Sequence, residues 1–474
     1  MAPVGVRAGM HRAIPILALL ALAALLAPPA QAQLGGGPEQ IHLAYGADAA
    51  TSVTVAWVGP VVAPGGARVE YGVDAGFGSK AEAATPIPLP GATHVAYRAT
   101  LSGLTPATTY TYRVVTGQTS EAFTFTTAPI GDAPFVVAAW GDHGTTDPAA
   151  VTGTKKAPGE NVALAMNLTP DFHIAAGDLS YSNGEPSVWD AYFRMMQPYA
   201  SGVPYMTAVG NHEREPGQGF HQYDARLAMP SKPGERWYAF RYANAVFVSL
   251  DTEHACVMTP VEDRLPGSLP TRCQTGPNPE QRGFLESTLK AARADATVRW
   301  VVVFHHYPIW SDARHGSNIA VRNLWAPLYD EYKVDVVVQG HDHVYERTKP
   351  LVGTTVSAVG TTYVTAGTGG ISHYKFKSDT PPEWEAARNE EDFGLLLMSF
   401  DNDTLVGEFH TLAGEVKDRF TLVKDASGGS GLAPDGAASP TPDATPTPKA
   451  TPGPALLAGI VVATLAAAAA RRRA

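Results

Sequence analysis

Residues 172–181 read FHIAAGDLSY, and this stretch is the one from which the fold can be predicted. It begins as a short apolar run and ends in the polar residues Asp178, Ser180 and Tyr181. A short apolar run bounded by turn residues fits a strand that is buried on both faces. In sheets of such strands ligands collect beyond the carboxyl ends, so the residues after the run are expected to face a ligand.

The same pattern occurs five times in the middle of the chain. Its apolar runs occupy residues 135–140, 172–176, 205–209, 300–304 and 334–338. A helical pattern at residues 281–292 places Phe284, Leu285 and Leu289 on one face. Buried strands that alternate with helices indicate a layered domain of the α/β or α+β class, which we expect at residues 133–424.

Each apolar run is followed by a polar cluster. The clusters are GDHG at 141–144, GDLSY at 177–181, GNHE at 210–213, HHYP at 305–308 and GHDH at 340–343. They offer carboxylate, amide and imidazole ligands and no thiolate, a set that suits hard or borderline metals such as Fe, Mn and Zn. One Gly-Asp after a strand is most often a turn, but five clusters in this order predict a metal site.

The averages of the whole chain exclude several classes of protein. Its 474 residues suggest two to four domains. A net charge of −10 gives no support to nucleic-acid binding, which needs a basic face. Only two cysteines occur, so the chain is neither a disulfide scaffold nor a thiolate metal protein.

Residues 38–128 have the pattern of an all-β domain. Val53, Val55 and Trp57 alternate with Thr54 and Ala56, and Gly/Pro turns separate the short strands. This pattern predicts a β-sandwich. Residues 104–110 (LTPATTY) resemble the strand-linking corner of fibronectin type III domains, so we expect a scaffold with that fold.

The first 32 residues have the pattern of a signal peptide. Arg7 and Arg12 precede an apolar run at 14–26, and Ala-Gln-Ala at 30–32 fits a cleavage site. We therefore expect export. An oxidising compartment would permit a disulfide between Cys256 and Cys273, the alternative being two free thiols.

The C-terminal 50 residues predict a stalk and an anchor. Residues 425–454 are rich in Pro, Thr, Ser and Gly, and residues 455–470 (ALLAGIVVATLAAAAA) are apolar. We expect a single transmembrane segment with a cytoplasmic basic tail at 471–474, which would hold the protein at the cell surface or cell envelope. A sorting signal that is removed, giving a secreted protein, and an Ala-rich soluble helix are the alternatives.

The order of the five polar clusters resembles that of the calcineurin-like metallophosphoesterases, and of the purple acid phosphatases in particular. General metallophosphoesterases begin with Asp-x-His, whereas Gly144 stands two residues after Asp142 here. Purple acid phosphatases carry a Tyr in the second cluster, as Tyr181 does here. The resemblance covers residues 38–424 and implies the plant-type form, in which a fibronectin III-like domain precedes a four-layer α/β sandwich.

The resemblance also implies seven metal ligands. The first metal, Fe(3+), would take Asp142, Tyr181 and His343. The second metal, Fe(2+), Zn(2+) or Mn(2+), would take Asn211, His306 and His341, and Asp178 would bridge the two ions.

Five further residues near these ligands have expected roles. The resemblance implies that His212 and His315 are catalytic and face the substrate phosphate and the leaving group. His305 is expected to be a core or supporting residue, the alternative being that His305 and not His306 is the ligand, and His143 is expected to be a bystander. Arg314 stands where plant-type enzymes often carry another His, and it could hold a second phosphate or point to solvent.

The predicted function is that of an exported purple acid phosphatase acting on a small phosphate ester. The resemblance implies hydrolysis of phosphomonoesters by a metal-bridged hydroxide at an Fe(III)–M(II) centre. One alternative is a Mn- or Zn-dependent enzyme that cleaves phosphodiesters or nucleotides. Another is a non-catalytic surface binding protein, for which degenerate ligands would be expected.

Overall fold

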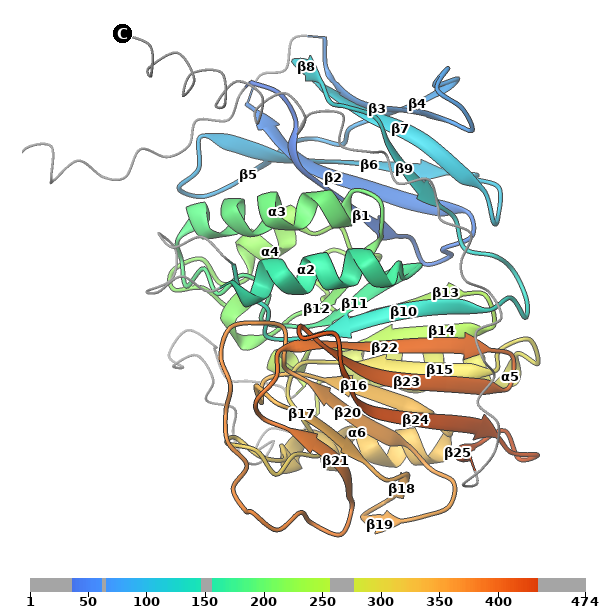
Figure 1. Cartoon of the computed structure of the whole chain (residues 1–474). Coiled ribbons are helices and arrows are strands. Elements are labelled where there is room, and N and C mark those ends of the chain that lie inside the picture. Colours follow the sequence, from blue (N-terminus) through green and yellow to red (C-terminus); the bar gives the residue numbers. More distant parts are fainter. Residues whose placement is uncertain (1–35, 62–64, 146–155, 256–276, 434–474) are drawn as a thin grey trace, which may run out of the picture. The chain divides into compact units, whose positions relative to one another are not determined.

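The computed structural model describes residues 36–61, 65–145, 156–255 and 277–433 (Figure 1). The predicted signal peptide (1–32), Cys256, Cys273 and the predicted segments at 455–470 and 471–474 lie outside the described residues. The five apolar runs of the sequence coincide with five strands in the described part.

The N-terminal part of the described chain consists of two antiparallel β-sheets, with strand orders β1-β2-β6-β5 and β4-β3-β7-β8 and with β9 paired to β7. Along β7 the side chains alternate, and Tyr110, Tyr112 and Val114 are buried. The predicted N-terminal all-β domain is therefore confirmed. Its strands are β1 (Glu39–Tyr45), β2 (Ser52–Pro60), β3 (Ala67–Gly72), β4 (Ser79–Glu82), β5 (Ile87–Pro88), β6 (His94–Ser102), β7 (Thr109–Thr116), β8 (Gln118–Thr119) and β9 (Phe123–Thr126).

The first sheet of the second domain has the strand order β12-β11-β10-β22-β23-β24-β25 within the described residues. β10, β11 and β12 are parallel, and the remaining strands continue antiparallel from β22. The bounds are β10 (Phe135–Trp140), β11 (Phe172–Ala176), β12 (Tyr205–Ala208), β22 (Gly394–Asp401), β23 (Thr404–Thr411), β24 (Val416–Lys424) and β25 (Ser430–Leu432).

The second sheet has the strand order β13-β14-β15-β16-β20-β17-β21 in the same described ranges. Its central strands β14, β15, β16 and β20 are parallel. The bounds are β13 (Tyr238–Tyr242), β14 (Ala245–Ser249), β15 (Trp300–Phe304), β16 (Val336–Gln339), β17 (Tyr345–Thr348), β20 (Thr362–Ala366) and β21 (Glu385–Asn389), with the hairpin β18 (Leu351–Val352) and β19 (Thr355–Val356) beside them.

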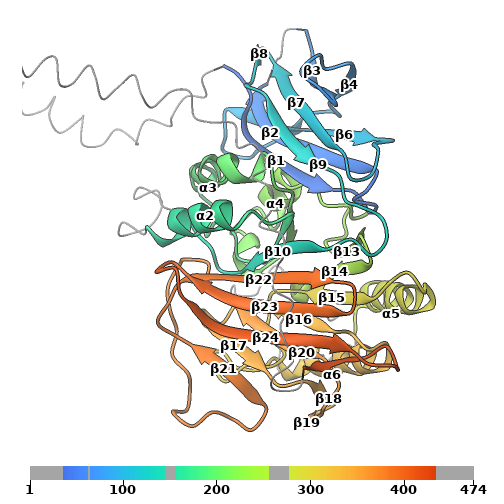
Figure 2. The same cartoon turned by 45° about the vertical axis from the view of Figure 1, so that its right-hand side comes forward.

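Helices cover the outer faces of the two sheets, which gives four layers (Figure 2). Trp189 and Phe193 of α3 pack with Trp140 on the first sheet, and Leu285 and Leu289 of α5 pack on the second. The inner faces meet in one hydrophobic core, to which both aliphatic and aromatic side chains contribute. The predicted α/β domain is therefore confirmed, and its helices are α2 (Ala157–Leu168), α3 (Pro186–Ala200), η1 (Asn211–Glu213), α4 (His221–Arg226), η2 (Thr252–His254), α5 (Pro279–Ala294) and α6 (Ile319–Glu331).

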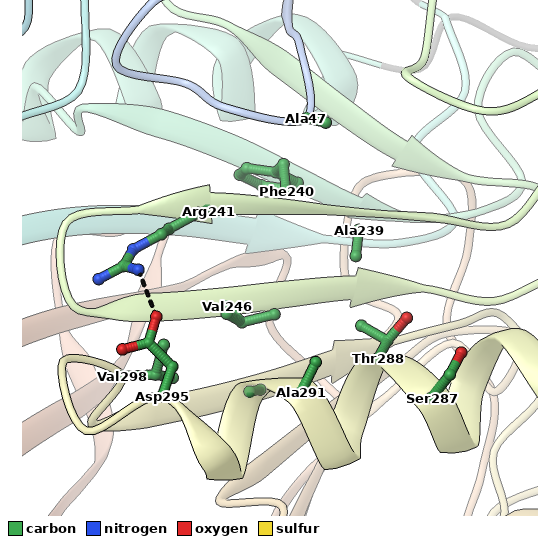
Figure 3. A pocket seen from close by; sticks show the side chains of 11 residues that line it. Ala47, Ala239, Phe240, Arg241, Val246, Ser287, Thr288, Ala291, Asp295 and Val298 are labelled. Carbon is green, nitrogen blue, oxygen red and sulfur yellow. Dashed lines mark hydrogen bonds and ion pairs between the residues drawn. The ribbon is translucent and has the colours of Figure 1, made fainter.

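The N-terminal domain contacts the outer strand β13. The backbone of Arg241 donates to Ala47 O at 3.0 Å and accepts from Ala49 N at 3.3 Å. Its guanidinium pairs with Asp295 of the α5 end at 2.9 Å, along a shallow groove between β13 and α5 (Figure 3). These bonds use the exposed edge of β13, which would otherwise be open to another strand.

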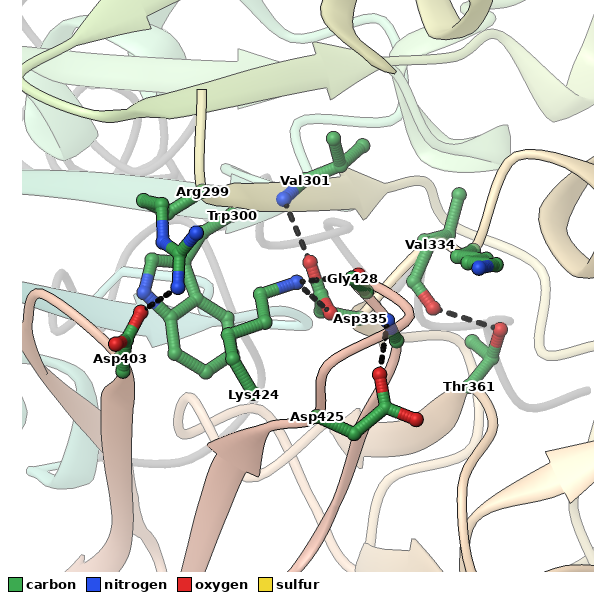
Figure 4. A network of polar contacts seen from close by, with 12 residues as sticks. Arg299, Trp300, Val301, Val334, Asp335, Thr361, Asp403, Lys424, Asp425 and Gly428 are labelled. Carbon is green, nitrogen blue, oxygen red and sulfur yellow. Dashed lines mark hydrogen bonds and ion pairs between the residues drawn. The ribbon is translucent and has the colours of Figure 1, made fainter. Parts of the chain in front are cut away.

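A buried ion-pair network fixes the C-terminal strands to the second sheet (Figure 4). Asp335, directly before β16, pairs with Lys424 at the end of β24 and lies 2.9 Å from Arg293. The chain then continues as β25, which pairs with β24 inside the segment expected to be a stalk. Here Gly431 lies against the carbonyl of Ala358, a close approach that its missing side chain permits.

The predicted transmembrane segment needs a correction. Within the described residues, no helix is long and apolar enough to cross a membrane, and the longest, α5, has 16 residues. This finding contradicts the C-terminal transmembrane part of the predicted fold class, which is dropped. The physical reason lies in the length of the described helices: the 16 residues of α5 reach about 24 Å, less than a hydrocarbon core of about 30 Å. Residues 455–470 themselves lie outside the described part.

Candidate metal centre

The polar clusters meet where the carboxyl ends of the two sheets come together. The first sheet supplies Asp142 after β10, Asp178 and Tyr181 after β11, and Asn211 after β12. The second supplies His306 after β15, and His341 and His343 after β16. All seven side chains belong to buried residues.

Tight turns aim these side chains across the gap between the sheets. Asp142, Asp178 and His341 have positive φ angles of 58°, 52° and 70°. Such values are uncommon for residues with a side chain and occur where the surroundings hold the backbone. A Cβ on Gly340 would lie 2.8 Å from Asp142 Oδ2, so only glycine allows this approach.

Asp142, Tyr181 and His343 form a first cluster. The Tyr181 hydroxyl lies 3.0 Å from Asp142 Oδ1 and 3.1 Å from His343 Nε2. His343 Nε2 is 3.4 Å from the same carboxylate oxygen. Three potential ligand atoms therefore converge on one point from two sheets.

Asp178, Asn211, His306 and His341 form a second cluster. His306 Nε2 lies 3.0 Å from Asn211 Oδ1 and 3.2 Å from Asp178 Oδ1. One ligand atom each of Asp178, His306 and His341 lies within 4.8 Å of the others. This buried triad is a candidate metal site.

Neighbouring groups fix the orientation of the imidazoles. His306 Nδ1 lies 2.8 Å from Ala176 O, and His343 Nδ1 lies 2.7 Å from Ser372 Oγ. Both histidines therefore direct Nε2 into the clusters. Such second hydrogen bonds orient ligands in metal sites.

The electrostatics of the second cluster favour a cation. Burial alone would lower the pKa of His306, but the charge and hydrogen bond of Asp178 outweigh it and raise the pKa to about 10. Burial raises the pKa of Asp178, yet the charges of His306 and His212 bring it well below its usual range. In the first cluster, burial raises the pKa of the Tyr181 phenol far above its ordinary value. A positive charge is thus stabilised beside Asp178, and the oxygen and imidazole donors fit iron, zinc or manganese.

His212 and His315 lie at the exposed side of the two clusters. The His212 ring is 4.3 Å from that of Tyr181, and its Nδ1 lies 2.9 Å from Asn183 Oδ1. The His315 ring is 4.3 Å from that of His341. Both imidazoles lie beside candidate ligands without being part of either cluster.

His305 and His143 lie apart from both clusters. His305 is buried beside Trp325 of α6, with 5.4 Å between the rings. His143 stacks on Trp140 at 4.3 Å, and its Nε2 lies 3.0 Å from Pro158 O. Burial lowers the pKa of each to about 3, so both imidazoles are neutral core groups.

Sequence reasoning missed two residues that shape the centre. The Glu213 carboxylate accepts from the backbone N–H groups of Asp178, Leu179 and Gly210 at 2.7–2.9 Å, and so joins two of the turns. Its place in GNHE was a usable signal. Tyr374 stacks on His343 at 3.9 Å, but it comes from a loop without any motif.

Three protein-family profiles match the chain and together cover more than two thirds of it. They are "Purple acid Phosphatase, N-terminal domain" at residues 38–127, "Calcineurin-like phosphoesterase" at 159–345 and "Iron/zinc purple acid phosphatase-like protein C" at 360–419. Fold and site therefore place the chain among the calcineurin-like phosphoesterases.

Within that class, the chain belongs to the purple acid phosphatase family. A solved structure of purple acid phosphatase PPD1 from yellow lupin (Lupinus luteus) seeds is similar, with a TM-score of 0.71 and 25% identity over 83% of this chain and 75% of that one. Two curated relatives share part of the sequence. The uncharacterized protein Rv2577 of Mycobacterium tuberculosis is 35% identical over 54% of this chain and 51% of its own length. "Probable inactive purple acid phosphatase 1" of Arabidopsis thaliana is 31% identical over 54% and 43%. The chain thus spans about half the length of the curated relatives it matches.

Proposed function

We propose that this chain is an active acid phosphatase that hydrolyses phosphomonoesters at a pair of metal ions. Asp142, Tyr181 and His343 would hold the first ion, Fe(3+). The second ion, Fe(2+), Zn(2+) or Mn(2+), would be held by Asn211, His306 and His341, with Asp178 shared. When bound, the ions would supply Lewis acidity for the phosphate and lower the pKa of a water molecule.

The residues around the ions would orient the ester and move a proton. His212 and His315, on the exposed side of the clusters, would contact the phosphate oxygens and the leaving oxygen. The water oxygen forms the new bond to phosphorus, the ester bond breaks, and one imidazolium gives its proton to the departing alkoxide. General acid catalysis of this kind contributes roughly 10²–10⁴-fold.

The observation that carries this proposal is the phenol in the first cluster. Tyr181 places its hydroxyl 3.0 Å from Asp142 Oδ1 and 3.1 Å from His343 Nε2, at the point where the cluster converges. A phenolate is a hard oxygen ligand, which suits a highly charged ion such as Fe(3+). The likeness to the lupin purple acid phosphatase supports the same interpretation.

The test combines a phosphatase assay with a visible spectrum of the purified protein and of Tyr181→Phe. We expect hydrolysis of phenyl phosphate by the wild-type protein and a tyrosinate-to-iron charge-transfer band that the variant loses. Tyr374→Phe is the matched control, because it removes a phenol beside His343 whose ring stacks without entering the cluster. It should keep the band.

The alternatives give different results. If the protein is active but colourless and prefers phosphodiesters, the result would indicate a pair of Mn or Zn ions in place of the ferric site. A protein that binds metal but hydrolyses no phosphate ester would be a binding protein, and the proposed activity would be wrong.

A further inference from the structure

The Arg314 guanidinium is an unpaired cation next to a proposed catalytic residue. Arg314 precedes His315 and is exposed, and its guanidinium lies over the ring of Tyr374 at 4.8 Å. Throughout the described ranges, no hydrogen bond or ion pair of the Arg314 side chain is found. Its five N–H donors are therefore free to bind an anion.

The loop that carries Arg314 is tied to the metal centre. The Asp342 carboxylate accepts from His315 N at 2.8 Å, from Gly316 N at 3.0 Å and from Ser311 Oγ at 2.7 Å. Asp342 lies between the proposed ligands His341 and His343 in the chain. Because both loop and ligands are anchored to this residue, Arg314 is held at a fixed place relative to the centre.

Lys377 brings a second cation to the same loop. A side chain on Gly316 would collide with Lys377 Nζ, so the ammonium lies directly against the loop. The backbone N–H of Lys377 donates to Asp312 O at 2.9 Å, which holds the two segments together. Lys375, two residues earlier, pairs with Glu390 at 2.9 Å, whereas Lys377 has no such carboxylate among the described residues.

We propose that Arg314 and Lys377 recognise an anionic group on the leaving-group side of the substrate. The inference rests on the proposed function, because it takes the phosphate to be bound at the metal centre and the leaving group to pass His315. A carboxylate or a second phosphate on that leaving group would then meet both cations. The preferred substrates are accordingly phosphomonoesters whose alcohol carries a second negative charge.

The chemistry of the two cations favours binding of a substrate anion over a position in which both side chains only face solvent. A guanidinium forms two parallel hydrogen bonds to a carboxylate or phosphate, which an ammonium reinforces as a point charge. The Tyr374 ring holds the guanidinium through a cation–π contact. The Arg314 side chain therefore loses less conformational entropy when an anion binds. The two cations come from two segments that the bond from Lys377 N–H to Asp312 O holds together.

The test compares 4-carboxyphenyl phosphate with its methyl ester, which has a similar leaving group but no second charge. We expect the wild-type protein to favour the carboxylate in kcat/KM, and Arg314→Ala to reduce this preference about two- to fivefold, as for an ion pair at an exposed rim. Higher salt should reduce it as well. Arg314→Lys should keep more of the preference than Arg314→Ala, since it has the positive charge but not the two parallel N–H donors of the guanidinium.

A second pair of substrates, butane-1,4-diyl bisphosphate and butyl phosphate, separates a second phosphate from a carboxylate. Lys375→Ala is the charge-matched control and should keep both preferences, because that ammonium is already paired. Calorimetric binding of (4-carboxyphenyl)methylphosphonate and its methyl ester to the wild-type protein and Arg314→Ala gives a readout independent of turnover.

The possible results separate the two proposals. If the wild-type protein hydrolyses none of the esters, the proposed function fails, although the phosphonates still test Arg314. A second result is that the wild-type protein hydrolyses charged and neutral esters alike, and that Arg314→Ala changes neither the ratio of their kcat/KM values nor the phosphonate affinity. The proposed recognition of an anion by Arg314 and Lys377 would then be wrong, and the proposed phosphatase activity would be unaffected.

Discussion

Gln40 and His94 of the N-terminal domain meet Asp190 of α3 and Arg226 of α4 at a contact that we call the domain junction. The junction and the candidate metal centre are both polar and largely buried, but only at the junction does each acceptor have a matching donor or cation. At the junction, Asp190 Oδ1 lies 2.9 Å from the Arg226 guanidinium and 3.0 Å from both His94 Nε2 and Gln40 Nε2. Burial would raise the pKa of Asp190, but the hydrogen bond from His94 and the charge of Arg226 lower it to about 2. The cluster carries its own counter-charge and needs no ligand.

At the metal centre, by contrast, the buried acceptor groups outnumber the donors and cations that could pair with them. Two carboxylates, an amide oxygen and three imidazoles converge, and no arginine or lysine side chain is bonded to them in the described part of the chain. The Asp178 charge stabilises a proton on His306, whose pKa is raised to about 10. The difference teaches that burial of polar groups alone does not mark a functional site, whereas buried acceptors that lack a matching cation do.

The largest expected effect is that of His306→Ala on the metal centre. We expect kcat/KM to fall at least about 10³-fold, equivalent to about 4 kcal/mol, because the second ion loses an imidazole. Metal content should fall with it, whereas His143→Gln should keep its metal, since His143 bonds Pro158 O instead. Full activity of His306→Ala with both metals bound would refute the ligand assignment.

The junction should respond in stability and not in metal content. Arg226→Met leaves the Asp190 carboxylate without its guanidinium and should cost about 3 kcal/mol, measured by urea unfolding of the metal-loaded protein. Arg98→Met is the matched control, because within the described residues Arg98 bonds only the carbonyls of Asp224 and Ala225, so its removal leaves no carboxylate unpaired. Equal losses in both variants would mean that the junction is not held by its ion pair.

Glu213→Gln tests whether the turns of the metal centre are held from behind. The amide keeps one acceptor oxygen but replaces the other with N–H₂, which faces backbone donors. We expect a 10–100-fold loss of kcat/KM or of metal affinity, about the effect of removing a group that orients ligands. Wild-type metal affinity and turnover in this variant would show that the turns need no such support.

The smallest expected effect is a pH dependence from His42 at the junction. Burial lowers the pKa of His42 from 6.5 to about 4, so the folded protein keeps it neutral while the unfolded chain protonates it below about pH 6.5. With respect to His42, the folded protein has its full stability above about pH 6.5 and loses stability as the pH falls towards 4. Between pH 7.5 and 5.5 the wild-type protein should therefore lose about 1 kcal/mol more than His42→Gln, measured by urea unfolding. Parallel losses would remove His42 as the cause.

The comparison also shows which features could be predicted from the sequence. The strands and their polar ends were predictable, because the apolar runs and the clusters behind them are local patterns that need no knowledge of the partner sheet. Asp142, Asp178 and His341 could be placed at strand ends in the same way, but their positive φ angles could not be predicted. Their backbone N–H groups donate to groups that follow other strands, namely Gly177 O, Glu213 Oε2 and Asp142 Oδ2.

Features that depend on distant pairs could not be predicted. His42 bonds Arg226 O across 184 residues, and Asn161 of α2 bonds Gly394 O across 233. Neither pair has a spacing that marks it in the sequence. The same holds for Tyr374, whose stacking on His343 and contact with Arg314 come from a loop without a motif. The segment expected to be a stalk also supplies strand β25, and its Gly- and Ser-rich composition gave no signal for a strand.

Metal content of the purified protein, measured per chain by elemental analysis, tests the central claim most directly. The seven converging side chains predict two metal ions per chain, at least one of them iron. Asp178→Asn should hold one ion or fewer, because the proposed function assigns this carboxylate to both ions. A wild-type protein that takes up no iron would contradict the account, and so would an Asp178→Asn variant that still holds two ions.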